Sequence, residues 1–129
     1  MSVVEECYRG SQVRVFRLNR EAALASLRRR AQALLVERAE VREVRLFGSL
    51  KDDRAGPGSD ADILIILANS SVSFPERIPV YAAYFSGIGL PCDVFPYTTR
   101  ELASNHFAAE AASHSAVLAT RSPGPPCGA

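Results

Sequence analysis

Three aspartates are the residues of this sequence best suited to chemistry. Asp60 and Asp62 precede the apolar run Ile63–Leu67, which predicts a β-strand. Side chains two apart on a strand point the same way, so both carboxylates project from one face at its start. Asp93 lies near the start of another predicted strand, in an apolar segment where a charge is costly unless it is paired or liganded. If the two strands are neighbours, three acids converge at one end of the sheet.

Carboxylates this close repel each other, and without a partner one of them should have a raised pKa. A hard divalent cation such as Mg²⁺ relieves the repulsion, since it accepts oxygen ligands from a few carboxylates together with phosphate. The alternative is ordinary turn chemistry, because Gly58-Ser59-Asp60 is a typical turn sequence. The chain has five aspartates, and three of them stand at these positions, which favours a metal site.

Gly48 and Ser49 follow a predicted strand that ends at Phe47. A glycine there lets the backbone turn sharply and approach a ligand closely. A short helix beginning at Ser49 would present free N–H groups to an anion such as a triphosphate. Taken alone, the pair predicts only a tight turn. The sequence has neither a Walker loop nor a dinucleotide-binding fingerprint.

The first half of the chain predicts the elements that position these residues. Gln12–Leu18 alternates polar and apolar residues, which favours a half-buried edge strand, while residues 1–10 stay undecided. Asn19 is the predicted N-cap of a helix. Its apolar stripe is Ala23, Leu24, Leu27, Ala31, Leu34 and Leu35. Val41–Phe47 predicts a second strand, with Val44, Leu46 and Phe47 in the core. Ile63–Leu67 is apolar on both sides and predicts a central strand.

The second half adds helices and a strand. One helix could begin after Ser73, where Ser73 and Glu76 have capping-box spacing, or at Pro79; we favour Pro79, because a proline disrupts a helix interior. Gly87 and Gly89 would end it. Leu90–Tyr97 predicts a third strand of the central sheet. Thr98–Glu101 predicts a capping box that opens a helix through about Ser113. Tyr81, Tyr84 and Phe85 are expected in the core, and His106 and His114 are expected to be exposed.

The predicted fold is therefore α/β (α+β), a mixed sheet of about four strands with helices packed on it. Residues 1–120 form one expected domain, followed by a disordered tail at 121–129. With 15 basic and 14 acidic residues, the chain gives no strong nucleic-acid signal. Its three unpaired cysteines indicate neither a disulfide framework nor a zinc site. No apolar stretch is long enough to span a membrane. Together with the cysteine content, this predicts a cytoplasmic protein.

The combined pattern resembles the nucleotidyltransferase superfamily related to DNA polymerase β. It consists of a strand, Gly48-Ser49, ten residues, Asp60-x-Asp62 on a second strand, and Asp93 on a third. Within that superfamily it is similar to the minimal nucleotidyltransferases, which often pair with HEPN proteins as toxin and antitoxin. The resemblance covers roughly residues 40–97.

The resemblance implies a role for each matching residue. Gly48 and Ser49 would contact the triphosphate of ATP or another nucleoside triphosphate. Asp60, Asp62 and Asp93 would bind Mg²⁺ or Mn²⁺, and Asp93 would also activate the attacking hydroxyl. The reaction implied is transfer of a nucleoside monophosphate, AMP for the HEPN-paired group, to a hydroxyl on a partner protein. For the quaternary structure, a homo-oligomer is an expected alternative to the complex with a HEPN partner.

The sequence departs from the family between the glycine turn and the acids. The usual loop is small and basic, whereas this one reads Leu50-Lys51-Asp52-Asp53-Arg54. Two added acids weaken the attraction for phosphates. The alternative hypothesis is therefore a catalytically weak or inactive member that serves as an antitoxin or assembly subunit. A third is an unrelated α/β ligand-binding domain.

Overall fold

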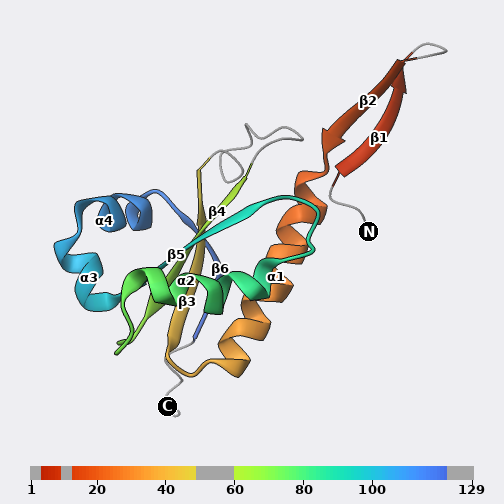
Figure 1. Cartoon of the computed structure of the whole chain (residues 1–129). Helices are drawn as coiled ribbons and strands as arrows, with labels where there is room; N and C mark the ends of the chain where they lie inside the picture. The colour runs from red at the N-terminus through yellow and green to blue at the C-terminus, as the bar shows by residue number, and fades with distance from the viewer. Residues whose placement is uncertain (1–3, 10–12, 49–59, 122–129) are drawn as a thin grey trace, which may run out of the picture.

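A computed structural model describes residues 4–9, 13–48 and 60–121 of the chain (Figure 1). Within these ranges no helix is both long and apolar enough to cross a membrane. The elements follow in the order β1 (Val4–Arg9), β2 (Val13–Leu18), α1 (Arg20–Glu37), β3 (Val41–Phe47), β4 (Ala61–Leu67), α2 (Phe74–Ala82), the 3₁₀-helix η1 (Ala83–Phe85), β5 (Cys92–Thr98), α3 (Thr99–Ser104), α4 (His106–Ser113) and β6 (Ala116–Thr120).

The centre of the molecule is a mixed four-stranded sheet in the order β5-β4-β3-β6. Strands β4 and β5 are parallel, while β3 is antiparallel to both of its neighbours, β4 and β6. Strand β4 is central, and every residue from Ile63 to Leu67 is buried. The apolar run predicted such a strand, because a central strand covered on both faces has no solvent side. The predicted fold class is confirmed.

The sheet has two covered faces, and helices α1 and α2 pack against the first of them. Asn19 caps α1 by accepting a hydrogen bond from the Ala22 N–H at 3.0 Å. The predicted stripe is buried except for Leu24, which packs at the edge of the core. From the sheet, the alternate β4 residues Ala61, Ile63, Ile65 and Leu67 join this core. Tyr81 and Phe85 are buried there as predicted.

The second face of the sheet is smaller and lies under α4. Leu64 and Ile66 of β4 are buried, as are Ala108 and Ala111 of α4, and all four lie outside the main core. Asp62 lies two residues before Leu64 on β4, so the two side chains share this second face. Phe47 and Asp93 pair directly with Asp62 on the neighbouring strands, so they lie on the same face. Arg45 ties β3 to the chain after α4 by donating to Ser115 Oγ at 3.1 Å.

The fourth strand of the sheet differs from the prediction. Strand β2 pairs with β1 in a separate two-stranded sheet, next to the start of α1 and apart from the main sheet (Figure 1). The free edge beside β3 is taken by β6, which sequence analysis missed. An alternating pattern shows that one face of a strand is covered, but it does not identify the covering partner.

Two helix predictions are corrected. Helix α2 begins at Phe74 after Ser73, whose hydroxyl donates to Glu76 at 3.0 Å, so Pro79 does lie inside it. The proline is tolerated because it is exposed, and water can satisfy the carbonyl one turn earlier. The helix expected through Ser113 is interrupted at Asn105, which caps α4 by accepting from the Ala108 N–H at 3.0 Å. A local cap therefore divides the segment into α3 and α4.

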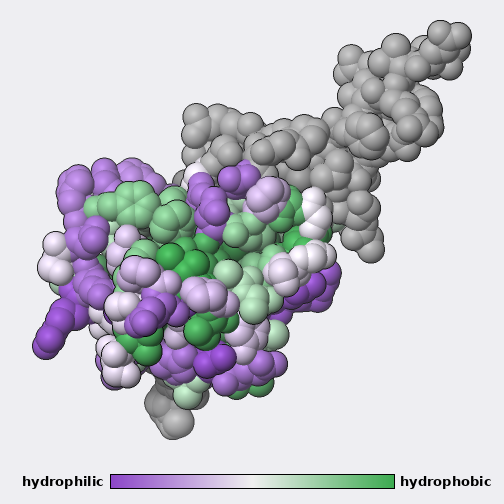
Figure 2. Space-filling model, viewed as in Figure 1, coloured by the Kyte–Doolittle hydropathy of each residue, from purple (hydrophilic) through white to green (hydrophobic). Residues whose placement is uncertain are grey.

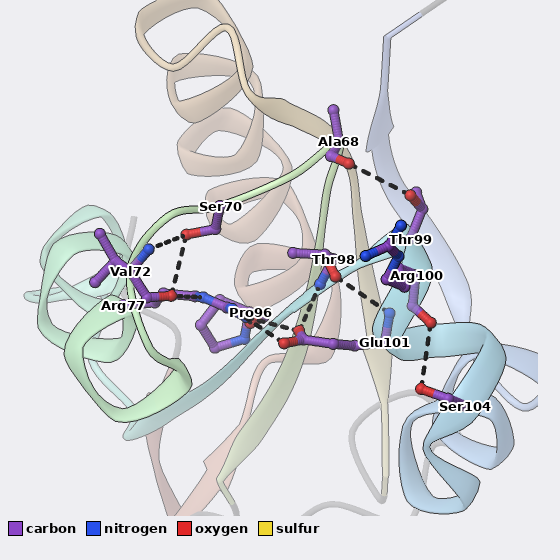
Figure 3. Close-up of polar contacts among 10 residues, drawn as sticks. All are labelled: Ala68, Ser70, Val72, Arg77, Pro96, Thr98, Thr99, Arg100, Glu101 and Ser104. Carbon is purple, nitrogen blue, oxygen red and sulfur yellow. Dashed lines mark hydrogen bonds and ion pairs between the residues drawn. The ribbon is translucent and has the colours of Figure 1, made fainter.

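The buried Arg77 joins α2, β5 and α3 (Figure 3). It lies near Thr98, which pairs with Leu67 at the end of β4 away from Asp62. Its guanidinium donates to both carboxylate oxygens of Glu101, at 2.7 and 3.0 Å, and to the carbonyls of Val72 and Pro96. Glu101 also completes the predicted capping box with Thr98. The Arg77 guanidinium, together with the bonds from Thr98, lowers the pKa of Glu101 to about 2.

Arg121, the first residue of the predicted tail, is held in place. Its backbone N–H donates to the carbonyl of Arg42, and its guanidinium donates to the carbonyls of Leu35, Arg38 and Val41. These bonds fasten the end of β6 to the end of α1 and the start of β3. Residues 122–129 lie outside the described part of the chain.

Candidate functional site

Asp62 and Asp93 are direct register partners on the parallel strands β4 and β5. Asp93 is exposed and Asp62 is half-buried. Asp60, exposed, comes two residues before Asp62, just ahead of β4. The structure therefore brings Asp62 and Asp93 to the same end and face of the sheet, with Asp60 near enough for its charge to raise the pKa of Asp62. The two strands are neighbours, which is the condition on which the expected convergence depended.

The electrostatics of this group follow from its crowding. Burial raises the pKa of the Asp62 carboxyl above its ordinary value of 3.8, and the negative charges of Asp93 and Asp60 raise it further. In this setting the ionised carboxylate is unfavourable by itself, and a bound cation stabilises it. The raised pKa of Asp62 thus indicates that a bound positive ion would stabilise its ionised form.

Gly48 borders the acidic group from β3, the other strand that pairs with β4. Its φ of +86° lies in the left-handed region that favours glycine. A Cβ built on Gly48 would collide with Oδ2 of Asp62, so only a residue without a side chain lets the backbone lie against this carboxylate. The glycine is thus required twice, by its dihedral angle and by the space it leaves.

The donor set suits a hard divalent cation, because carboxylate oxygens are the ligands that Mg²⁺ prefers. The observation that supports the fit is the unfavourable placement of Asp62, which is half-buried and lies beside two like charges. Across the described ranges, however, no three acidic, histidine or cysteine side chains already form a group that could hold a metal ion. Any such ion would therefore have to draw these carboxylates together as it binds.

Ser49 and the unusual loop Leu50–Arg54 lie outside the described residues, so the predicted contact of Ser49 with a phosphate stays a prediction. On the opposite face of β5 from Asp93, burial raises the pKa of the Cys92 thiol to about 11. Cys92 packs against the main core and behaves as a small apolar residue.

Aromatic side chains beside the acids were not predicted as part of a site. Phe47 and Phe95 pack at 5.4 Å between ring centroids, and Phe107 of α4 lies 6.2 and 5.6 Å from them. Phe47 was expected in the core but is only half-buried. The missed signal is that Phe95 stands two residues after Asp93 on one strand, and so shares its face.

A shallow groove lies between the end of β3 and α4. Phe47, Gly48, Phe107, Glu110, Ala111 and His114 line it. His114 is exposed, as predicted, with its Nε2 3.6 Å from Oε1 of Glu110. His106 is also exposed, at the start of α4. Of the two histidines, only His114 lines this groove.

Comparison with known proteins agrees with the fold. The chain is similar to a crystal structure of a candidate nucleotidyltransferase from Sulfolobus solfataricus, with a TM-score of 0.62 and 16% identity, over 81% of this chain and 86% of that one. That likeness shows the fold. No curated protein matches the chain significantly. The model of the nucleotidyltransferase domain family matches residues 27–107, a stretch that contains Gly48, Asp60, Asp62 and Asp93. The chain therefore belongs to the nucleotidyltransferase domain family.

Proposed function

We propose that this chain transfers a nucleoside monophosphate, AMP, from ATP to a hydroxyl group on a partner protein. The observation that carries the proposal is the pairing of Asp62 with Asp93 across β4 and β5, with the backbone of Gly48 against Asp62. Strands β3, β4 and β5 thereby bring two acids and the turn at Gly48 to the same end of the sheet. Family membership supports nucleotidyl transfer in general.

Asp60, Asp62 and Asp93 would hold a divalent cation, Mg²⁺ or Mn²⁺. When bound, such an ion neutralises phosphate charge and lowers the pKa of a nearby hydroxyl. Asp62 is the central ligand in this proposal, because its burial and its two like-charged neighbours make its ionised form unfavourable without a cation. The exposed Asp60 and Asp93 complete the set from either side.

In the proposed reaction the acceptor oxygen bonds to the α-phosphorus of ATP as the bond from that phosphorus to the bridging oxygen breaks. Pyrophosphate leaves, and the proton of the acceptor hydroxyl passes to the carboxylate of Asp93. Asp93 suits this role because it is exposed at the start of an edge strand, where an acceptor can approach it. Gly48 and Ser49 would bind the triphosphate through the turn after β3.

The acceptor we propose is a tyrosine of a small helical HEPN protein in the cytoplasm, which makes this chain the antitoxin of a pair. The support is the resemblance of residues 40–97 to that group.

The test is pyrophosphate release from ATP and Mg²⁺, with and without a HEPN protein encoded beside this gene. We expect release only when the acceptor is present, and a mass increase of the acceptor by one AMP. Asp93→Asn should reduce the rate by at least about 100-fold, the usual contribution of a general base. The matched control is Glu21→Gln, which neutralises an exposed acid on α1 and should leave the rate unchanged.

Two results would contradict the proposal. Wild-type protein that binds no ATP in the presence of Mg²⁺ would favour the inactive binding protein, as the acidic loop Leu50–Arg54 suggests. Full activity in Asp93→Asn would instead show that the acids assigned here do not perform the chemistry.

A further inference from the structure

We propose that the groove between the end of β3 and α4 binds the nucleobase of the nucleoside triphosphate, with Phe107 as the stacking surface. This inference rests on the proposed function and adds a recognition site to it. Neither the acids nor Gly48 can distinguish one base from another, because they act on phosphates and a cation.

The groove is continuous with the proposed site. Gly48 lines the groove and at the same time lies against the carboxylate of Asp62. A molecule held by its phosphates at Gly48 can therefore extend directly toward Phe107 and Ala111. The groove measures about 270 Å³. This is at the lower limit of pockets that enclose a whole drug-sized ligand, so it suits one ring system with the phosphates outside it.

Phe107 has the properties of a stacking surface. It is 48% exposed, which is unusual for a large aromatic residue packed beside others. Phe47, Phe95 and Tyr97 support its ring, with centroids at 6.2, 5.6 and 6.5 Å. The ring is thus held in place by its neighbours while part of it stays open to solvent. In Figure 2, hydrophobic residues gather over α4, with hydrophilic residues around them.

The rim of the groove carries polar groups that could contact the edge of a base. Glu110 and His114 are both exposed and lie 3.6 Å apart, too far for a strong hydrogen bond between them. The Glu110 carboxylate can accept a hydrogen bond from an exocyclic amino group. His114 can donate to or accept from a ring nitrogen. A base with an amino group, such as adenine, uses both, whereas uracil offers no amino group to Glu110.

The test compares ATP with inorganic tripolyphosphate, which has the phosphates but no base. Dissociation constants are measured with Mg²⁺ for wild type, Phe107→Leu and Phe107→Tyr. Leucine keeps the apolar volume but removes the aromatic face, and tyrosine keeps the face. We expect Phe107→Leu to weaken ATP binding roughly tenfold, in the range for base stacking on an aromatic side chain, with tripolyphosphate binding unchanged. Phe107→Tyr should bind ATP like wild type.

The control is Val36→Ala, which shortens an 83% exposed apolar side chain on α1 and should change neither affinity. Equal ATP affinity in wild type and Phe107→Leu would overturn the nucleobase site and leave the proposed function standing. A parallel loss of ATP and tripolyphosphate binding in Phe107→Leu would also overturn it, since the effect would not depend on the base. Wild type that binds neither compound would contradict the proposed function itself.

Discussion

Asp62 has Asp93 as its register partner on β5 and Phe47, the residue before Gly48, as its partner on β3. The central strand therefore holds one carboxylate between a second acid and a glycine turn. Segments 14 or more residues apart in the chain meet at this point. The consequences for stability and for ligand binding can be tested separately.

The first prediction concerns the charge of Asp62. In metal-free buffer at neutral pH, Asp62→Asn should raise the free energy of unfolding by on the order of 0.5 kcal/mol, because it removes a half-buried charge and its repulsion from Asp93 and Asp60. A pKa that is higher in the folded state means that ionisation disfavours folding. This penalty is present above the folded-state pKa and disappears as the pH falls below the ordinary value of 3.8.

Urea unfolding at neutral pH and below that value measures the difference. The extra stability of Asp62→Asn should vanish at the lower pH, where the Asp62 carboxyl of wild type is protonated and therefore as neutral as the asparagine. Glu21→Gln is the control, since it neutralises an exposed acid on a different element, α1. A variant less stable than wild type in metal-free buffer at neutral pH would show that Asp62 is stabilised by its surroundings, contrary to the raised pKa.

The second prediction concerns the cation. Added Mg²⁺ should raise the melting temperature of wild type in proportion to the logarithm of its concentration once the site is filled, because a ligand that binds only the folded state stabilises it. The increase should be absent in Asp62→Asn. Thermal unfolding followed by circular dichroism checks this. An equal increase in both proteins would mean that the ion binds elsewhere.

The third prediction separates two roles of Gly48. Gly48→Ala and Gly87→Ala both place a side chain at a positive φ, +86° and +75°. This should cost each variant about 1 kcal/mol of stability. Only at position 48 does the new Cβ collide with Asp62, whereas at position 87 it meets nothing within 4 Å. Gly48→Ala should therefore be the less stable variant and should lose ATP binding, while Gly87→Ala binds normally. Loss of ATP binding in both variants would contradict this assignment.

The fourth prediction concerns the ion pair of Arg77 and Glu101. Glu101→Gln keeps a residue that can complete the capping box but removes the charge that faces a buried guanidinium. It should cost about 2 kcal/mol, the contribution of a hydrogen bond to a charged group. The pKa of Glu101 is about 2 in the folded protein, so this stability is present above pH 4.5 and is lost as the pH falls from there toward 2.

Denaturant unfolding of Glu101→Gln at neutral pH measures this cost. Glu76→Gln is the matched control, because Glu76 is an exposed acid of α2 that accepts a hydrogen bond from the Ser73 hydroxyl, and it should change stability by under about 0.5 kcal/mol. Similar costs in the two variants would show that the Arg77 pair adds no stability of its own. Activity should be unaffected in both, since the pair lies at the other end of the sheet from Asp62.

The fifth prediction concerns Arg121. Arg121→Met keeps the length of the stem but removes the guanidinium bonds to the carbonyls of Leu35, Arg38 and Val41. We expect a loss of about 2 kcal/mol, because those carbonyls lose a charged donor. Arg28→Met, an exposed arginine on α1, is the control. Equal stability of both variants would show that β6 holds without this clamp.

The sequence by itself determined the local features of this protein. Asn19, Thr98 and Glu101 predicted caps that the structure confirms, because a cap depends on residues three positions apart. The apolar run Ile63–Leu67 predicted a central strand, and the spacing of Asp60 and Asp62 predicted that they share a face. Each of these inferences needs only the period of a helix or a strand.

The tertiary structure decided which segments meet. It paired Asp62 with Asp93, gave the sheet edge to β6 instead of β2, and carried α4 over the second face so that Phe107 came beside Gly48. It also admitted Pro79 into α2, where solvent exposure offsets a poor local preference. Pairing across a sheet depends on the free energy of burying whole faces together, and no short window of sequence contains that information.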